Sequence, residues 1–188
     1  TVLTPKRNFY EKMVACLDFA SLYPSIMIAH NLCPTTYVSD TKYNNIEGVD
    51  YKKFEWERGS YIFVQNKKSL VPYILTSLWT ERKKVKREMA EAYEIADNYK
   101  KEDDMINYKK YLSIASVLNG KQLALKISMN SIYGAFGAST FSISCKPISS
   151  TVTYIGRTMI EHSKNCAESW YNGKTTIKIN IIPDRKIE

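Results

Sequence analysis

The alternation of apolar and polar positions predicts mixed structure in the first part of the chain. A short apolar run at residues 13–17 favours a buried strand. Pro24 suits the first turn of a helix, and the apolar positions after it predict a helix over residues 25–31. The pattern over residues 37–68 predicts irregular β structure, in which residues 61–64 are the clearest strand. This part of the chain is therefore expected to combine strands with one helix.

The pattern changes to a helical period at Ser69. Apolar residues recur with helical spacing over residues 69–99 and again over residues 106–133. The charged run at residues 100–104 separates the two patterns and favours a short solvated turn. We therefore expect an antiparallel helical hairpin, with a break near residues 119–120, where Asn and Gly interrupt the second helix.

The last part of the chain returns to mixed structure. Residues 140–144 have β character, residues 149–170 have a helical period, and residues 175–182 alternate as a strand does. An Asn-Gly pair at residues 172–173 marks a turn between the last two. The complete pattern predicts an α+β fold that carries an inserted helical hairpin.

Composition adds a class of partner. The 27 basic and 19 acidic residues give a net charge of +8, which favours a polyanionic partner such as nucleic acid or a nucleotide. The apolar runs are too short to cross a bilayer, so no membrane partner is expected. Four widely spaced cysteines without a Cys-x-x-Cys pair argue against a zinc site and favour reduced thiols in an intracellular protein.

The segment Asp18–Ile26, which reads DFASLYPSI, places a carboxylate between an apolar run and a helix start. A carboxylate there can hold a hard cation, and the backbone N–H groups of a strand-to-helix turn can hold a phosphate. Together these groups suit phosphoryl transfer. A single Asp in this position more often ends a strand or caps a helix, so the carboxylate alone does not decide between the two interpretations.

Polar stripes on the predicted hairpin offer further candidate ligands for a triphosphate. Arg82 and Lys86 are four residues apart and share one face of the first helix. The second helix carries a stripe with an ammonium, an amide, a phenol and a bare backbone position: Lys126, Asn130, Tyr133 and Gly134. Without further information, a solvated basic face and a C-capped amphipathic helix explain these residues equally well.

Three strings in a fixed order resemble the motifs of the family B DNA polymerases. They are Asp-x-x-Ser-Leu-Tyr-Pro-Ser-Ile from Asp18, Lys-x-x-x-Asn-Ser-x-Tyr-Gly from Lys126, and the shorter Thr-x-x-Gly-Arg from Thr153. A basic two-helix insertion separates the first two, as in that family. The details resemble the replicative branch of eukaryotes and large DNA viruses. The resemblance implies a palm in two parts, residues 1–68 and 137–188, with a fingers hairpin at residues 69–136.

The resemblance also implies roles for residues of the first motif. Asp18 and the carbonyl of Phe19 are expected to bind two magnesium ions, and the amides of Ser21 and Leu22 the nucleotide phosphates. Tyr23 is expected to lie under the deoxyribose, where a 2′-hydroxyl group would collide with its ring.

The resemblance also implies roles for residues of the hairpin. The triphosphate is expected to be bound by Arg82, Lys86, Lys126 and Asn130. Lys126 is also expected to protonate the leaving pyrophosphate, and Tyr133 and Gly134 to pack on the nascent base pair. The resulting function is template-directed addition of deoxynucleotides to a primer 3′-hydroxyl. The expected partners are primer–template DNA and dNTPs, with a processivity factor as a further candidate, at the nucleus or a viral replication site.

One part of the family pattern does not occur in this sequence. The Asp-Thr-Asp turn that supplies the other catalytic carboxylate is absent. We therefore expect a fragment that ends before this turn and is inactive alone. The alternative is a non-catalytic relative that binds nucleic acid or has a structural role in a replication complex.

Overall fold

The computed structural model describes residues 8–9, 11, 17–57 and 59–171. Within these ranges the chain forms four α-helices, three short strands and one 3-10 turn. In chain order they are α1 (Leu22–Ala29), β1 (Tyr37–Val38), η1 (Thr41–Tyr43), β2 (Tyr51–Trp56), β3 (Gly59–Val64), α2 (Leu70–Lys101), α3 (Met105–Gly137) and α4 (Lys146–Tyr171). In these ranges no helix is both long and apolar enough to span a membrane. The predicted α+β class is confirmed.

The strands form a small antiparallel sheet in the order β1-β3-β2. Tyr37 of β1 pairs with Phe63 of β3, and Tyr51 of β2 pairs with Val64. Alternation along the strands places Phe54 and Phe63 on the face that packs against the helices, where both rings are buried. The predicted strand at residues 61–64 therefore exists, as part of β3.

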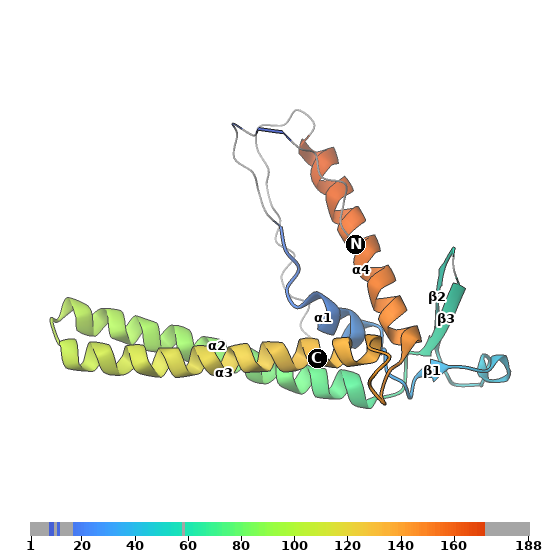
Figure 1. The fold of residues 1–188 in the computed structure, drawn as a ribbon, viewed down its shortest axis with the longest axis horizontal. Coiled ribbons are helices and arrows are strands. Elements are labelled where there is room, and N and C mark those ends of the chain that lie inside the picture. Colours follow the sequence, from blue (N-terminus) through green and yellow to red (C-terminus); the bar gives the residue numbers. More distant parts are fainter. Residues whose placement is uncertain (1–7, 10, 12–16, 58, 172–188) are drawn as a thin grey trace.

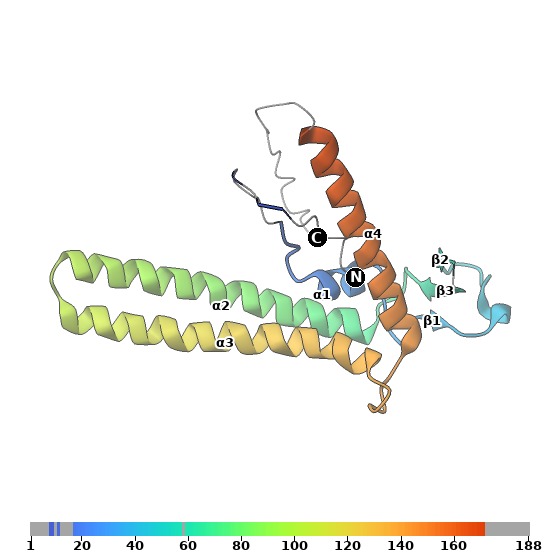
Figure 2. The same ribbon diagram turned by 45° about the horizontal axis from the view of Figure 1, so that its top comes forward.

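Helices α2 and α3 pack side by side as a long hairpin that projects away from the sheet (Figures 1 and 2). Asp104 caps α3 by accepting a hydrogen bond from the N–H of Asn107 at 3.0 Å. The expected break near Gly120 is wrong, because α3 is continuous through it. A glycine in a helix interior costs only about 1 kcal/mol, which packing along the whole hairpin can offset.

The predicted strand at residues 140–144 is also wrong. These residues form turns, in which the N–H of Phe141 donates to the carbonyl of Ala138 and the N–H of Ser144 donates to that of Phe141. These two N–H groups are satisfied inside the loop, so they do not need a partner on a neighbouring strand. The strands predicted at residues 13–17 and 175–182 lie outside the described residues, apart from Leu17, which is exposed and not in a strand.

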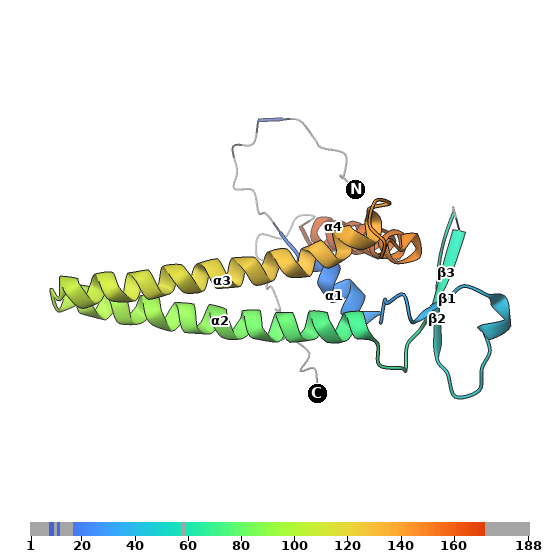
Figure 3. The same ribbon diagram turned by 60° about the horizontal axis from the view of Figure 1, so that its bottom comes forward.

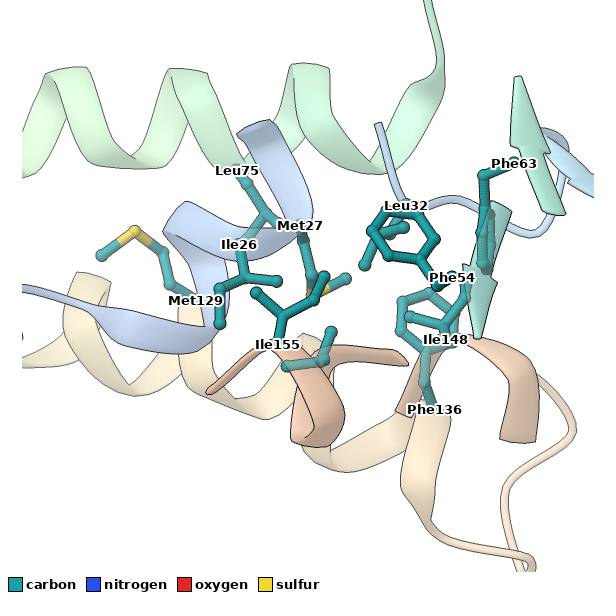
Figure 4. Close-up of a cluster of buried hydrophobic side chains, with 11 residues drawn as sticks. Ile26, Met27, Leu32, Phe54, Phe63, Leu75, Met129, Phe136, Ile148 and Ile155 are labelled. Carbon is teal, nitrogen blue, oxygen red and sulfur yellow. The ribbon is translucent and has the colours of Figure 1, made fainter. Parts of the chain in front are cut away.

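Helix α1 lies at the centre of the hydrophobic core, between the hairpin and α4 (Figures 3 and 4). It begins three residues before the predicted start, with Pro24 inside its first turn. The core joins α1, the sheet and the bases of the three long helices. Its buried residues are Ile26, Met27, Leu32, Phe54, Phe63, Leu75, Met129, Phe136, Ile148, Val152 and Ile155.

Replacement of Leu75 by Ala tests this core. The Leu75 side chain is fully buried where α2 meets α1, so its truncation leaves a cavity and should lower the free energy of unfolding by roughly 2–5 kcal/mol. The matched control is Ile106→Ala near the hairpin tip, where the side chain is 84% exposed and the change should be small. Equal effects of the two substitutions on the thermal midpoint would contradict this core.

Candidate functional site

The turn before α1 is the first component of the site. Ser21 has φ 50° and ψ 51°, a left-handed conformation uncommon for a residue with a side chain. Its carbonyl accepts hydrogen bonds from both the N–H and the hydroxyl of Ser25. The Ser21 side chain makes no cap, so the N–H groups of Leu22 and Tyr23 at the start of α1 stay available to an anion.

Arg82 connects this turn to the hairpin. Its Nη1 lies 3.4 Å from the hydroxyl oxygen of Ser21, and its Nε donates to Oε1 of Gln122 on α3 at 3.3 Å. The half-buried Arg82 side chain thus links α2, which carries it, to the Ser21 turn and to α3. Lys86 lies one turn further along the same face of α2 and is exposed.

The predicted polar stripe of α3 lies on the same side of the hairpin. Gln122 contacts Arg82, and Lys126 and Asn130 follow it at intervals of four residues. Both side chains are exposed, and neither has a hydrogen bond or ion pair with any other described residue. Sequence reasoning missed Gln122, although its helical spacing from Lys126 places it on the stripe.

Two acidic side chains of the hairpin form ion pairs with lysines of the hairpin. The Nζ atom of Lys121 on α3 donates a hydrogen bond to Oε1 of Glu81 at 2.7 Å. This hydrogen bond, together with the positive charge of Lys121, lowers the pKa of the Glu81 carboxyl group. The Nζ atom of Lys84 lies 4.0 Å from Oε1 of Glu88, one turn further along α2. Glu81 and Glu88 therefore pair with Lys121 and Lys84, and among the described residues no carboxylate forms an ion pair with Arg82, Lys86 or Lys126.

A stacked pair of aromatic rings joins the first and second motifs. The rings of Tyr23 and Tyr133 have centroids 4.3 Å apart and an interplanar angle of 23°. The hydroxyl oxygen of Tyr133 is 3.1 Å from that of Thr153, which donates its single proton to the carbonyl of Ser149 at 2.8 Å. Tyr133 must therefore donate to Thr153. The three motifs found in the sequence thus meet through Tyr23, Tyr133 and Thr153.

The space around this aromatic pair is open. A cavity of about 420 Å³ lies beside it, lined by Tyr133, Gly137, Ser149, Ser150, Thr153, Tyr154 and Arg157. A Cβ atom placed on Gly134 would meet nothing within 4 Å. Packing among the described residues therefore does not require a glycine there, and the bare backbone remains free for a ligand.

Asp18 and Phe19 lie just before the Ser21 turn. Asp18 is exposed and Phe19 is half-buried. Their carboxylate and carbonyl oxygens are of the kind that Mg²⁺ prefers. The described residues contain no cluster of three or more His, Cys, Asp or Glu side chains. Asp18 and Phe19 therefore offer oxygen ligands of the type that suits magnesium, but too few of them to form a complete site.

Comparison with known proteins identifies the family. A family model described as "DNA polymerase family B" matches residues 1–187 of the chain. The chain is 44% identical over 178 residues to the DNA polymerase delta catalytic subunit of Candida albicans, covering 93% of this chain and 15% of that protein. It is 37% identical over 201 residues to a DNA polymerase of Paramecium bursaria Chlorella virus NY2A, covering all of this chain and 20% of the viral protein.

A solved structure supports the same family. The family B DNA polymerase of the archaeon Pyrobaculum calidifontis matches with a TM-score of 0.58 and 28% identity, over 81% of this chain and 17% of that one. The chain therefore belongs to DNA polymerase family B. It spans about a sixth of the length of these relatives, which are nucleotidyltransferases.

The histidine at the end of α1 provides a pH test of this region. Burial lowers the pKa of His30 below its ordinary value of 6.5, and the ammonium of Lys52, 3.3 Å from its Nδ1, lowers it further. The unfolded chain then binds the proton more readily than the folded chain. Stability should be greatest above about pH 6.5 and should fall as the pH drops below that value.

Replacement of His30 by Gln should reduce this pH dependence of the thermal midpoint between about pH 5.5 and 7.5. The control is His162→Gln on the exposed part of α4, which should keep the wild-type slope. An unchanged slope in His30→Gln would show that another group is responsible.

Proposed function

We propose that this chain forms the nucleotide-binding side of the active site in a larger template-directed DNA polymerase. The observation that carries the proposal is the stack of Tyr23 on Tyr133, which joins residues from two motifs far apart in sequence. The contact between Arg82 and Ser21 supports it, since it brings a cation from the hairpin to a turn with available N–H groups. In this proposal the hairpin is the fingers, and the sheet and remaining helices are part of the palm.

The positive face of the hairpin suits a triphosphate. Arg82, Lys86 and Lys126 supply cations on one side of α2 and α3, and Asn130 adds an amide. The N–H groups at the start of α1 face the same region and add dipoles that favour negative charge. These groups hold the β- and γ-phosphates, and Lys126 donates a proton to the leaving pyrophosphate.

Tyr23 and Tyr133 then shape the pocket for the sugar and the base pair. The Tyr23 ring is 40% exposed and supported from one side by Tyr133. A ring held in this way can block a 2′-hydroxyl group, so it discriminates against ribonucleotides by collision. Gly134 follows Tyr133 and leaves open backbone against which a base pair can pack.

Asp18 and the Phe19 carbonyl are the residues of this chain that would hold magnesium. The metal, when bound, supplies Lewis-acid activation of the primer hydroxyl and neutralises charge on the pyrophosphate. The remaining carboxylate is expected from the Asp-Thr-Asp turn that this sequence lacks. The chain alone is therefore expected to bind its substrates incompletely and to be inactive.

Replacement of Tyr23 by Ala in the full-length polymerase tests the sugar-discrimination role. Removal of the ring should raise the efficiency of ribonucleotide relative to deoxynucleotide incorporation by about tenfold or more, because the collision is relieved. Tyr43→Ala is the matched control, since Tyr43 is an exposed tyrosine on η1. An unchanged ratio of the two kcat/KM values in Tyr23→Ala would contradict this assignment.

Replacement of Lys126 by Ala tests the catalytic role. The maximal incorporation rate should fall by about 10²–10⁴-fold if Lys126 donates a proton in the rate-limiting step. The affinity for primer–template should stay close to wild type. Lys110→Ala, an exposed lysine on the same helix near the hairpin tip, should change neither quantity. Wild-type rates in Lys126→Ala would contradict the proton-donor role of Lys126.

A further inference from the structure

The link between the sheet and the hairpin is short and contains little backbone hydrogen bonding. Strand β3 ends at Val64 and α2 begins at Leu70, so residues 65–69 form what we call the hairpin root. Its described backbone bonds to other segments are few. The N–H of Gln65 donates to the carbonyl of Asp50 at 2.8 Å, and the carbonyl of Ser69 accepts from Tyr73 inside α2. Side chains must therefore supply most of what holds the root in place.

Asn31 supplies these contacts. Its Nδ2 donates to the carbonyls of Val64 and Lys67, each at 2.8 Å, and its Oδ1 accepts from the hydroxyl of Ser69 at 2.5 Å. The amide thus uses both of its protons and its oxygen on the root and on Val64, the residue just before it. Gln65 adds a parallel contact, since its Nε2 donates to the carbonyl of His30 at 3.0 Å.

The backbone at the end of α1 explains how Asn31 reaches the root. The N–H of Leu32 donates to the carbonyl of Met27, and the N–H of Asn31 donates to that of Ile28. This pair of bonds is a Schellman motif, with Asn31 at the position that takes a left-handed conformation, here φ 49°. Leu32 is then fully buried. Asn is one of the few residues that adopts this conformation readily.

The same short helix therefore carries the candidate phosphate-binding turn at one end and the hairpin anchor at the other. Helix α1 has 8 residues, a length of about 12 Å. We propose that Asn31 is a positioning residue that fixes the hairpin relative to the Ser21 turn. It thereby sets the placement of the triphosphate-binding cations. This inference rests on the proposed function, because those cations matter only if the site binds a nucleotide.

The geometry of the hairpin makes the root an effective control point. Arg82 lies twelve residues after Leu70 on α2, so it is about 18 Å from the root. A tilt of about 5° at the root would move Arg82 by about 1.5 Å over this distance. Errors of about 1 Å in a catalytic constellation can cost about 10²-fold in rate. Away from its base the hairpin projects free of the other described elements, as Figures 1 and 2 show.

The test replaces Asn31 by Gly in the full-length polymerase. Glycine accepts the left-handed backbone, so the substitution removes the side-chain contacts and adds no conformational strain. We expect the apparent Kd for the correct dNTP to rise about tenfold, while the Kd for primer–template changes less than about twofold. Asn31→Asp should behave at least as severely, because a carboxylate cannot donate to the carbonyls of Val64 and Lys67.

The matched control is Asn66→Gly. Asn66 lies in the same root, and its Nδ2 donates to the carbonyl of Gly48 at 3.1 Å, a contact with a loop. This variant should leave both dissociation constants within about twofold of wild type. Equal shifts of the dNTP Kd in Asn31→Gly and Asn66→Gly, or a lower thermal midpoint with unchanged constants in Asn31→Gly, would overturn the positioning role.

Substitutions of Ser69 test the positioning role of Asn31 by a smaller change. The Ser69 side chain makes no cap bond to α2, so Ser69→Ala removes only its contact with Asn31. It should raise the dNTP Kd in the same direction by a smaller factor, and Ser69→Thr should restore the wild-type value. This series decides the question even if Asn31→Gly fails to fold. Failure of the proposed function would appear separately, as a wild-type polymerase without dNTP incorporation.

Discussion

The burial of α1 between the hairpin and α4 is the constraint on which the rest of the structure depends. Ile26 and Met27 are almost completely buried there, against side chains from all three long helices. In the proposed function both ends of α1 have a role, so its position fixes two things at once. Its start presents the Ser21 turn, and its end presents the Asn31 amide to the hairpin root. A helix of this length could not hold a fixed place without that packing.

Charge is distributed unevenly around this framework. Glu81 and Glu88 of the hairpin pair with Lys121 and Lys84, whereas Lys86 and Lys126 are exposed and form no ion pair with any described residue. A positive face next to available helix N–H groups is a place for a phosphate. The stacked tyrosines beside it add the flat, apolar surface that a sugar and a base require.

The sequence predicted the long helices well and their contacts poorly. The helices predicted over residues 69–99 and 106–133 correspond to α2 and α3, because apolar residues that recur with helical spacing over many turns are a strong signal. Two predictions from local signals were wrong: the helix break near Gly120, where α3 is continuous, and the strand at residues 140–144, which form hydrogen-bonded turns. The stack of Tyr23 on Tyr133 and the Asn31 contacts join distant parts of the chain, so no local pattern could have indicated them. The motifs named candidate site residues but did not show which of them meet.

The most direct measurement is a structure of the full-length polymerase with primer–template and a correct incoming dNTP. The account predicts the triphosphate between the N–H groups at the start of α1 and the side chains of Arg82 and Lys126, with the deoxyribose over Tyr23. It also predicts that the Asn31 contacts to the hairpin root are preserved. A triphosphate bound away from the Ser21 turn, with Tyr23 not in contact with the sugar, would contradict the account.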